Sequence, residues 1–295
     1  MTILNFGSIN VDHVYRLPTI VKPGQTLASE GLTIGLGGKG ANQSVAIAAA
    51  GGEVKHFGRL GKDCRWAEQQ LAQRGVDTEH IALVDEPSGH AIIQLDCNGE
   101  NAIVVHGGAN LSFARSSLAA VLNSSDQWSH LLMQNECNLM ADAIELAHGK
   151  SLPVILNPAP MSDTAIAAPL HRVNTLVVNE TEANKLSGQS SPQAALDFLH
   201  KTYPQIRLVM TLGGAGAMLV HGDERLIIEA TKVDVVDTTA AGDTFVGYFV
   251  AGLAAGISNA ENLARAVVAG TLAVTQAGAV ASIPAADAVA QAMGD

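Results

Sequence analysis

The sequence is poor in cysteine and in positive charge. Cys64, Cys97 and Cys137 are the only cysteines in 295 residues, and no two of them form a C-x-x-C pair. An odd, widely spaced set argues against a zinc site and indicates a reducing compartment. Basic residues number 17 against 28 acidic ones, giving a net charge of −11, and lysine and arginine form no cluster. We therefore expect no nucleic-acid partner, and any polyphosphate site must use local backbone dipoles or Mg²⁺.

Long hydrophobic runs and targeting signals are also missing. The first basic residue is Arg16, and the apolar run Ile3–Phe6 is too short for the core of a signal peptide. Residues 266–286 carry no charge, but their Ala, Gly, Thr, Gln and Pro content fits a buried helix and a following loop better than a membrane span. Since no linker or internal repeat is visible, the sequence predicts one cytoplasmic domain over residues 1–295, without a membrane partner.

From residue 111 onward, helical and strand-like segments alternate along the chain. With a buried first strand at Ile3–Phe6, this rhythm predicts βαβ units and therefore an α/β fold with a mostly parallel central sheet between two layers of helices. Further strands are expected at 54–57, 130–134, 153–156, 175–178 and 207–211, and helices at 44–50, 65–74, 113–122, 139–148, 181–187, 192–201 and 263–275.

A different pattern, short β-like runs punctuated by Gly and Pro, occupies residues 13–36 and recurs later. Three such runs are His80–Val84, His90–Asp96 and Asn101–His106, and Asn98-Gly99 between the last two is a strong hairpin signal. We expect these runs to form a small separate sheet that acts as a lid over the site. The lid segments are expected at approximately 13–36 and 86–108.

A glycine-rich stretch joins these β-like runs to the next helix. Glycines at 35, 37 and 40 satisfy G-x-G-x-x-G, but a dinucleotide fold places that pattern directly after its first strand, whereas a strand and a β-rich insertion come first here. The P-loop pattern fails because Gly40 follows Lys39, where Ser or Thr is required. The stretch is either a packing turn or, as we favour, a turn that presents Lys39 and Asn42 to a small ligand.

Polar residues stand where predicted strands end. Asn10 and Asp12 follow the first strand at alternate positions, so both side chains can point to one side. Turn chemistry is the alternative explanation, since Asn and Asp favour loops. Open α/β sheets bind ligands outside the carboxyl ends of their strands. The repetition predicts a ligand site there, and the later strand-end residues are Gln134, Glu136, Asn157, Asn179, Glu182 and Thr211.

The stretch 233–256 predicts a short strand at 233–236, a turn at 238–242 and then a helix that is apolar on nearly every face. Asp243 is the only charged residue between Thr238 and Ala260. It is either a helix start signal, worth about 0.3–1 kcal/mol, or a general base that takes a proton from an attacking hydroxyl. The small residues Ala240, Ala241 and Gly242 leave backbone N–H groups uncovered for a phosphoryl group. The local sequence does not decide between the two roles.

Taken in order, these stretches resemble the ribokinase-like family of ATP-dependent sugar and nucleoside kinases. The resemblance runs essentially from end to end, and it implies that family's three-layer α/β/α fold with a small β-sheet lid. Ala240 stands where most of the wider family has Gly, a replacement that the ribokinase-like members share. The matching stretches are GSINVD (7–12), GGKGANQ (37–43), MQNE (133–136), LNPAP (156–160), NETEA (179–183), TLG (211–213) and VDTTAAGDTF (236–245).

The resemblance implies a role for each matching residue. Asp243 is implied to be the catalytic base, with Ala240, Ala241 and Gly242 as its anion hole. The implied sugar-binding residues are Asn10, Asp12, Gly38, Lys39, Asn42 and Glu136. The implied nucleotide-binding residues are Asn179, Thr211 and Gly213, and Asn179 with Glu182 is implied to hold Mg²⁺ mostly through water. The implied ligands of a monovalent cation, K⁺, act largely through backbone carbonyls and are Asp237, Thr239, Ala273, Gln276, Gly278 and Ser282.

The resemblance implies transfer of the ATP γ-phosphate to the primary hydroxyl of a pentose, and we expect ribose, giving ribose 5-phosphate. A kinase acting on 2-deoxyribose, a ketohexose or a nucleoside is the first alternative. A dinucleotide-dependent oxidoreductase using the glycine pattern and a non-catalytic sugar sensor are alternatives from other classes, and the intact Asp243 speaks against the sensor.

Two features of the lid carry further expectations. His90 occupies a position where a ribose enzyme is expected to have a small or aliphatic residue. It is either a lid-surface histidine, which we favour, or a residue that reaches the sugar and changes its identity. The lid strands present open edges and apolar faces, so we expect a homodimer formed through the lid.

Overall fold

The computed structural model describes residues 1–125 and 127–294. Within them, nine strands form a central sheet in the order β13-β12-β11-β10-β9-β8-β1-β4-β5. The strands from β11 to β5 pair in parallel, and β12 and β13 add an antiparallel hairpin at one edge. They are β1 (Thr2–Phe6), β4 (Val54–Gly61), β5 (Ile81–Val84), β8 (Trp128–Gln134), β9 (Val154–Asn157), β10 (Thr175–Asn179), β11 (Arg207–Thr211), β12 (Ala217–His221) and β13 (Glu224–Ile228).

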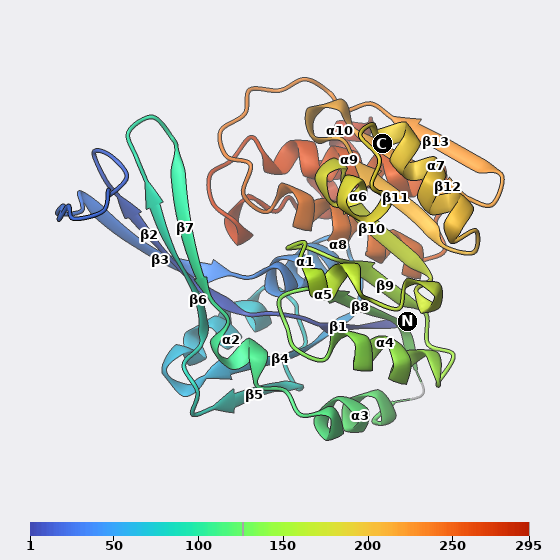
Figure 1. Cartoon of the computed structure of the whole chain (residues 1–295), viewed down its shortest axis with the longest axis horizontal. Coiled ribbons are helices and arrows are strands. Elements are labelled where there is room, and N and C mark those ends of the chain that lie inside the picture. The colour runs from blue at the N-terminus through green and yellow to red at the C-terminus, as the bar shows by residue number, and fades with distance from the viewer. Residues whose placement is uncertain (126, 295) are drawn as a thin grey trace.

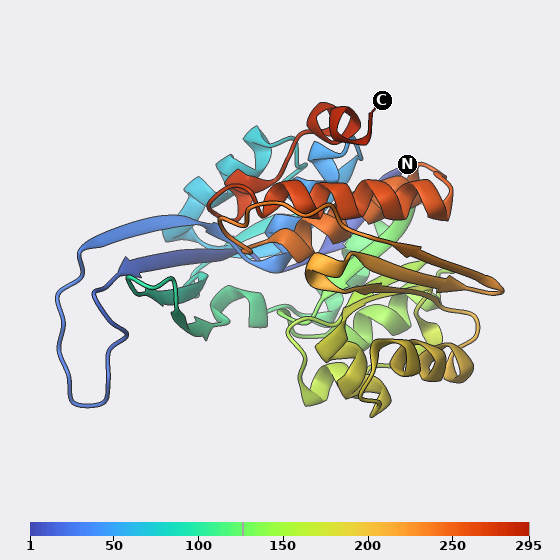
Figure 2. The same cartoon turned by 90° about the horizontal axis from the view of Figure 1, so that it is seen from above.

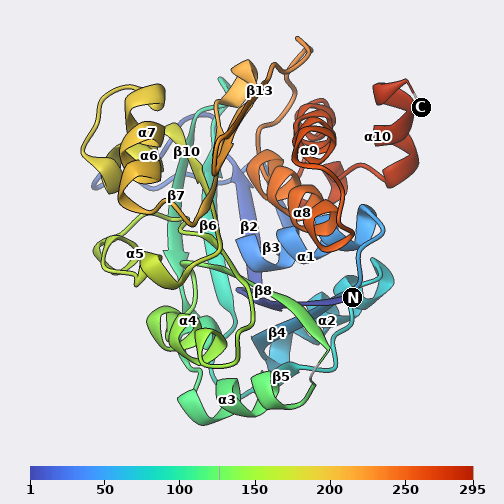
Figure 3. The same cartoon turned by 90° about the vertical axis from the view of Figure 1, so that its right-hand side faces the viewer.

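Helices cover both faces of this sheet, which confirms the predicted three-layer α/β/α fold. Figure 3 shows α4 to α7 on one side and α1, α8, α9 and α10 on the other. The helices are α1 (Lys39–Ala49), α2 (Arg65–Gln73), α3 (Arg115–Asn123), α4 (Met140–His148), α5 (Asp163–Ile166), α6 (Glu180–Ser187), α7 (Pro192–Thr202), α8 (Ala241–Ala254), α9 (Asn259–Ala273) and α10 (Ala286–Met293).

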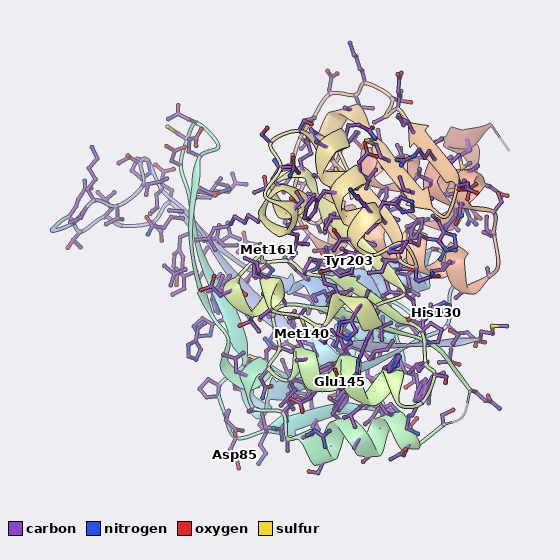
Figure 4. The ribbon with its side chains drawn as sticks, turned by 45° about the vertical axis from the view of Figure 1, so that its right-hand side comes forward. Asp85, His130, Met140, Glu145, Met161 and Tyr203 are labelled. Carbon is purple, nitrogen blue, oxygen red and sulfur yellow. The ribbon has the colours of Figure 1, made fainter. Side chains whose placement is uncertain are left out.

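Alternation along the strands divides the core in two. Neighbouring residues of one strand, such as Ile3 and Leu4 on β1, are fully buried and belong to different hydrophobic clusters on the two faces of the sheet. Met140, Met161 and Tyr203 pack in or against the second cluster, on the α4–α7 side (Figure 4). A parallel sheet buried on both faces is therefore the frame that fixes the strand ends.

The lid is a separate four-stranded sheet in the order β3-β2-β6-β7. Figures 1 and 2 show it projecting from the three-layer body, with the connection between β2 and β3 extending farthest away. Its strands are β2 (Asn10–Arg16), β3 (Gly31–Gly37), β6 (Gly89–Leu95) and β7 (Asn101–His106). The expected small separate sheet is confirmed, and it begins three residues before the expected boundary, at Asn10.

Several sequence-based expectations for the elements are wrong. The run at 80–84 belongs to the central sheet and not to the lid, because β5 pairs with β4. Residues 233–236 form no strand, and Val235 and Val236 are more than half exposed. The hairpin of β12 and β13 was not expected, and α1 begins at Lys39, five residues before the predicted start.

Helix boundaries follow local signals where these are present. The Ser191 side chain accepts from the Ala194 amide ahead of Pro192, and the Ser258 side chain caps α9 in the same way, so α9 starts before the predicted residue 263. Gly188, at φ 69°, ends α6 in the left-handed conformation that glycine tolerates best. None of the helices in the described residues is long and apolar enough to span a membrane.

Candidate active site

The candidate site centres on the N-terminus of α8. Ala240 precedes the helix in the left-handed conformation, at φ 59°, where glycine is the favoured residue. The amides of Gly242 and Asp243 have no acceptor within the described part of the chain, whereas the Ala241 amide donates to the Thr238 carbonyl at 3.3 Å. A Cβ atom at Gly242 would meet nothing within 4 Å. The expectation of a free amide at Ala241 is therefore wrong, while an open helix N-terminus remains beside it.

Asp243 is buried among polar partners and not among hydrocarbon. Asp243 is only 6% exposed, and both of its carboxylate oxygens accept hydrogen bonds within the protein. Asn42 Nδ2 donates to Oδ2 at 3.0 Å, and Gln43 Nε2 donates to Oδ1 at 2.9 Å. Helix α1 supplies both donors, because α1 and α8 pack against each other through Gly247 of α8. The carboxylate is thus held in one orientation at the open end of α8.

Charged groups from three other elements surround this carboxylate. Asp243 raises the pKa of Lys39, burial lowers it, and Glu136 and Glu182 raise it by smaller amounts. Burial raises the pKa of both Glu136 and Glu182, and Asp243 adds to each shift while Lys39 opposes it. The structure therefore brings Lys39, Glu136, Glu182 and Asp243 into one electrostatic cluster, although they are far apart in the sequence.

Glu136 links the first strand of the lid to α1. Its Oε2 accepts from Ser8 Oγ at 2.5 Å and from the Lys39 amide at 2.9 Å. Ser8 immediately precedes the turn into β2, and Lys39 is the first residue of α1 after β3. Gly38 between them has φ 93°, and a Cβ there would lie 2.8 Å from the Asn10 amide. One carboxylate therefore fastens both ends of the β2–β3 ribbon.

Asn10 and Asp12 lie in β2, so they belong to the lid and not to the end of a central strand. Asn10 Oδ1 accepts from Asn110 Nδ2 at 2.7 Å, a contact that was not expected. Asp12 faces Gly37, where a Cβ atom would lie 2.1 Å from its Oδ2. Burial, with a smaller contribution from Glu136, raises the pKa of Asp12 to about 6.

His90 points to the opposite face of the lid from Asp12. In the strand register, Asp12 is level with Ala91 and Gly35, whereas His90 is level with Val11 and Leu36. Its ring lies 5.0 Å from that of His106 and 6.2 Å from that of His13, centroid to centroid. The geometry supports the interpretation of His90 as a lid-surface histidine.

Asn179 and Glu182 form a reciprocal cap at the start of α6. Asn179 Oδ1 accepts from the Glu182 amide at 2.8 Å, and Glu182 Oε2 accepts from the Asn179 amide at 2.9 Å. The spacing of the two residues thus has a structural reason of its own. The other carboxylate oxygen of the buried Glu182, Oε1, takes no part in that cap.

A cavity of about 500 Å³ adjoins the start of α8. It contains the expected nucleotide residues Thr211 and Gly213, and it reaches Ala241 and Gly242. This volume is within the usual range for ligand sites. Val233 and Val235 line it, which gives these exposed valines a reason other than strand pairing. The remaining lining residues were not predicted, and they include Gly214, Gly216, Phe245, Val267, Gly270, Thr271 and Val274.

The expected monovalent-cation residues lie in two segments joined by Asp237, one ahead of α8 and one that runs from Ala273 at the end of α9 to Ser282. Asp237 Oδ1 accepts from the Thr239 amide at 2.8 Å, and its Oδ2 accepts from the Gly278 amide at 2.8 Å. Gln276 donates its amide to the Ala273 carbonyl at 3.3 Å, and Ser282 Oγ donates to the Ala279 carbonyl at 2.8 Å. Burial raises the pKa of Asp237, but the hydrogen bonds that it accepts from Thr239 and Gly278 together outweigh burial and leave the pKa lowered. In the described residues no three His, Cys, Asp or Glu side chains gather as a metal site.

Comparisons with known proteins agree with this geometry. Residues 2–286 match the pfkB family carbohydrate kinase profile. The chain is 37% identical to a ribokinase of Haemophilus influenzae over 96% of its own length and 95% of the relative's.

Solved structures point the same way. A Cryptococcus neoformans ribokinase in complex with ADP superposes with a TM-score of 0.86 at 36% identity, covering 99% of both chains. An Arabidopsis thaliana ribokinase complexed with ribose and ATP gives a TM-score of 0.84 at 27% identity, covering 98% of this chain and 97% of the other.

Proposed function

This chain belongs to the pfkB family of carbohydrate kinases, and from that premise we propose that it is a ribose kinase that converts ribose and ATP to ribose 5-phosphate and ADP. The observation that carries the proposal is Asp243, buried and doubly hydrogen-bonded where the 500 Å³ cavity meets the polar cluster around Lys39. The glycine pattern at 35–40 serves the lid and α1 in this family, so the oxidoreductase alternative is set aside.

Asp243 acts as the general base. It takes the proton of the sugar's primary hydroxyl as that oxygen forms a bond to the γ-phosphorus, and the bond from that phosphorus to the bridging oxygen of ADP breaks. Phosphoryl transfer depends on positioning and on charge stabilisation more than on covalent steps. The open N-terminus formed by Ala240, Ala241 and Gly242 is the anion hole, and the free amides of Gly242 and Asp243 support that role.

The sugar lies between the lid and α1. Asn42 supports this placement, because its Nδ2 is bonded to Asp243 while its buried Oδ1 has no partner among the described residues. A sugar hydroxyl supplies the donor that this oxygen lacks. Asp12, whose carboxylate lies beside Gly37 in the lid, is the second sugar contact. The other sugar contacts are Asn10, Gly38, Lys39 and Glu136.

ATP occupies the cavity, with Thr211 and Gly213 on its nucleotide side and Asn179 toward the phosphates. Asn179 and Glu182 would hold Mg²⁺, mostly through water, and the bound ion would neutralise phosphate charge. The residues fit such an ion, because Mg²⁺ keeps several waters and needs only one or two carboxylates. Glu182 is buried, and one of its oxygens is not used in the α6 cap.

A monovalent cation, K⁺, binds between the segments carrying Asp237, Thr239, Ala273, Gln276, Gly278 and Ser282. Support comes from the hydrogen bonds of Asp237, which tie one segment to the other directly ahead of the anion hole. Replacing KCl with tetramethylammonium chloride at constant ionic strength is expected to lower kcat. Equal rates in both salts would remove K⁺ from the proposal.

The protein works in the cytoplasm as a homodimer formed through the lid. Exposed apolar side chains on the lid support the dimer, among them Ile34, Ile92 and Val104, which share one face in the strand register. All three cysteines are free, as a reducing compartment would leave them. Light scattering at assay concentration tests the dimer, and a monomeric mass contradicts it.

A coupled ADP-release assay over ribose, 2-deoxyribose, a ketohexose and a nucleoside tests the substrate. We expect the highest kcat/KM with ribose, and a higher value for another acceptor would replace ribose in the proposal. Asp243→Asn is expected to lower kcat by about 10²–10⁴-fold. Asp287→Asn, an acid in the first turn of α10, is the matched control and should leave kcat unchanged. An active Asp243→Asn variant would overturn the base.

A further inference from the structure

A chain of buried side chains runs beneath Asp243 to His56 on β4. His56 is fully buried, and its Nε2 lies 3.1 Å from the Gly7 carbonyl. A carbonyl only accepts, so Nε2 carries the proton. Burial lowers the pKa of His56 to about 4, despite the opposing effect of the Gly7 bond, so the ring is neutral. Its Nδ1 is therefore an acceptor, and Ser44 Oγ donates to it at 2.9 Å.

Each following link has only one possible direction. Ser44 Oγ has given its proton to His56, so it accepts from Asn5 Nδ2 at 2.8 Å, while the second proton of Nδ2 goes to the Gly40 carbonyl. Asn5 Oδ1 then accepts from Gln134 Nε2 at 3.1 Å. The same Gln134 nitrogen donates to Gln43 Oε1 at 2.7 Å. The amide of Gln43 is thereby fixed with its oxygen toward Gln134.

A second, independent contact fixes Gln43 in the same sense. Asn157 Nδ2 donates to the Val177 carbonyl at 3.0 Å, so Asn157 Oδ1 must accept, and it does so from Gln43 Nε2 at 3.0 Å. The remaining proton of that nitrogen points to Asp243 Oδ1 at 2.9 Å. Every polar atom of Gln43 is therefore used within the protein, and none is left for the sugar. Asn42 differs in this respect, because its Oδ1 is free.

One buried polar atom in this series of side chains is not hydrogen-bonded among the described residues. Gln134 Oε1 is buried without a partner among the described residues, and a Cβ atom at Gly7 would lie 2.8 Å from it. A buried acceptor without a hydrogen bond destabilises the fold. The hydrogen bonds that orient the Gln43 amide are therefore formed at some cost in stability.

We propose that Gln43, oriented by Gln134 and Asn157, is a positioning residue that keeps the Asp243 carboxylate turned toward the acceptor hydroxyl. The inference rests on the proposed function, because it concerns the base of that reaction. An N–H donated to a carboxylate favours its ionised form and fixes its rotation. The other charged groups that face Asp243 are Lys39 from α1, Glu136 after β8 and Glu182 from α6, and the tests below leave all of them unchanged.

Steady-state kinetics of Gln43→Met against pH test the proposal. Loss of a hydrogen bond to a charged group predicts a fall in kcat of about 10- to 100-fold. The acid limb of the kcat profile should move up by about one pH unit, because the carboxylate is easier to protonate. The KM values for ribose and ATP should change less than about threefold, since Gln43 touches neither ligand.

Two further variants keep the test decisive if Gln43→Met folds poorly. Gln43→Glu keeps the shape but sets a second carboxylate against Asp243, so its acid limb should move further up than that of Gln43→Met. Gln134→Met keeps the hydrogen bond from Gln43 to Asp243 but removes the contact from Gln134 that orients the Gln43 amide. The kcat should therefore fall less than in Gln43→Met. Asn262→Ala is the matched control, because it removes a buried amide bonded to the Phe249 carbonyl farther along α8.

The outcomes separate the inference from the proposed function. A lowered kcat with a shifted acid limb and unchanged KM values supports the positioning role. The positioning role is overturned if the acid limb does not shift in the Gln43 variants. It is also overturned if kcat, KM and the melting temperature of these variants all change together, in the same way as in the Asn262→Ala control. Asp243→Asn is measured alongside. If that variant is inactive while the Gln43 variants keep their pH profile, only the positioning role fails, whereas an active Asp243→Asn variant removes the base itself.

Discussion

The central sheet and the lid are both built from short apolar strands, and they differ in what covers them. Helices lie on both faces of the central sheet, and Ile3, Leu132 and Ile155 are completely buried. The lid has no helical layer in the described structure, and Ile34 is 52% and Val105 60% exposed, on opposite faces. The same residue types thus form a central sheet that helices cover on both faces and a lid sheet that no helix covers in the described structure.

This difference separates two ways of arranging polar groups. Beneath α8, Asn42 and Gln43 each donate a hydrogen bond to Asp243, so the orientation of its carboxylate is set before any ligand arrives. In the lid, burial and, to a smaller extent, Glu136 raise the pKa of Asp12, whose carboxylate lies beside Gly37. The floor of the site is therefore preorganised by hydrogen bonds, whereas in the lid the burial of Asp12 disfavours its charged form.

The largest effect should come from adding volume to the closed frame. At Gly247, a Cβ atom would lie 2.3 Å from Ala46 Cβ and 2.8 Å from the Gln43 carbonyl, so Gly247→Val must force α8 away from α1. We expect a loss of about 3 kcal/mol or more in the free energy of unfolding. Gly35→Val in the lid meets no atom within 4 Å and should cost much less. Urea unfolding measures both, and equal losses would contradict the contrast between the sheets.

The second effect is acid sensitivity of the frame. The pKa of His56 is lowered to about 4 from 6.5, so its stabilising contribution is present above pH 6.5 and is lost as the pH falls from 6.5 to 4. The full shift corresponds to about 3 kcal/mol. NMR titration should find His56 neutral down to about pH 4. A His56 ring that protonates near pH 6.5 in the folded protein would refute the prediction.

The third effect belongs to the lid and to binding alone. Gly37→Ala places a methyl group where the Asp12 carboxylate lies, and that flexible side chain can rotate away at little cost in stability. Because Asp12 then leaves the sugar, the KM for ribose should rise about tenfold, equivalent to about 1.4 kcal/mol, with the KM for ATP unchanged. Gly35→Ala, on the same strand and face but in open space, is the control. Matching KM values in the two variants would show that Asp12 does not bind the sugar.

The smallest effect is on lid stability. The pKa of Asp12 is raised to about 6, so its contribution to stability is present below pH 3.8 and is lost as the pH rises through 6. Asp12→Asn should therefore stabilise the ligand-free protein by about 1 kcal/mol at pH 8, after discounting the shift for partial exposure, and by almost nothing at pH 4. Thermal unfolding at the two pH values measures this. A variant that is less stable than the natural protein at pH 8 would contradict it.

The sequence predicted the fold well where a single periodicity of apolar residues dominated a segment. Strands such as 175–178 and the alternating helices are recovered because burial on both faces of a parallel sheet leaves continuous apolar runs. The same signal misled at 233–236, where valines line the cavity and do not pair. It was also ambiguous at 81–84, because the strand pattern does not say which of the two sheets a strand joins.

The site was predicted as a set of residues and not as an arrangement. Asp243, Lys39, Glu136 and Glu182 were all singled out, and the structure brings them together. Gln43 was quoted within the glycine stretch without a role, because a buried amide gains meaning only from the partners that orient it. Asn110 was missed for the same reason. The bond from the Ala241 amide to Thr238 depends on backbone geometry, which residue identity does not report.

The root of the lid carries one further consequence. The ribbon of β2 and β3 leaves the body next to Ser8 and returns at Lys39, and Glu136 grips both points with a single oxygen atom. The base of the ribbon is therefore held by the same carboxylate that we assign to sugar binding. We expect a sugar hydroxyl that binds Glu136 to compete with its hydrogen bonds to Ser8 and Lys39, so that sugar binding and movement of the lid are coupled.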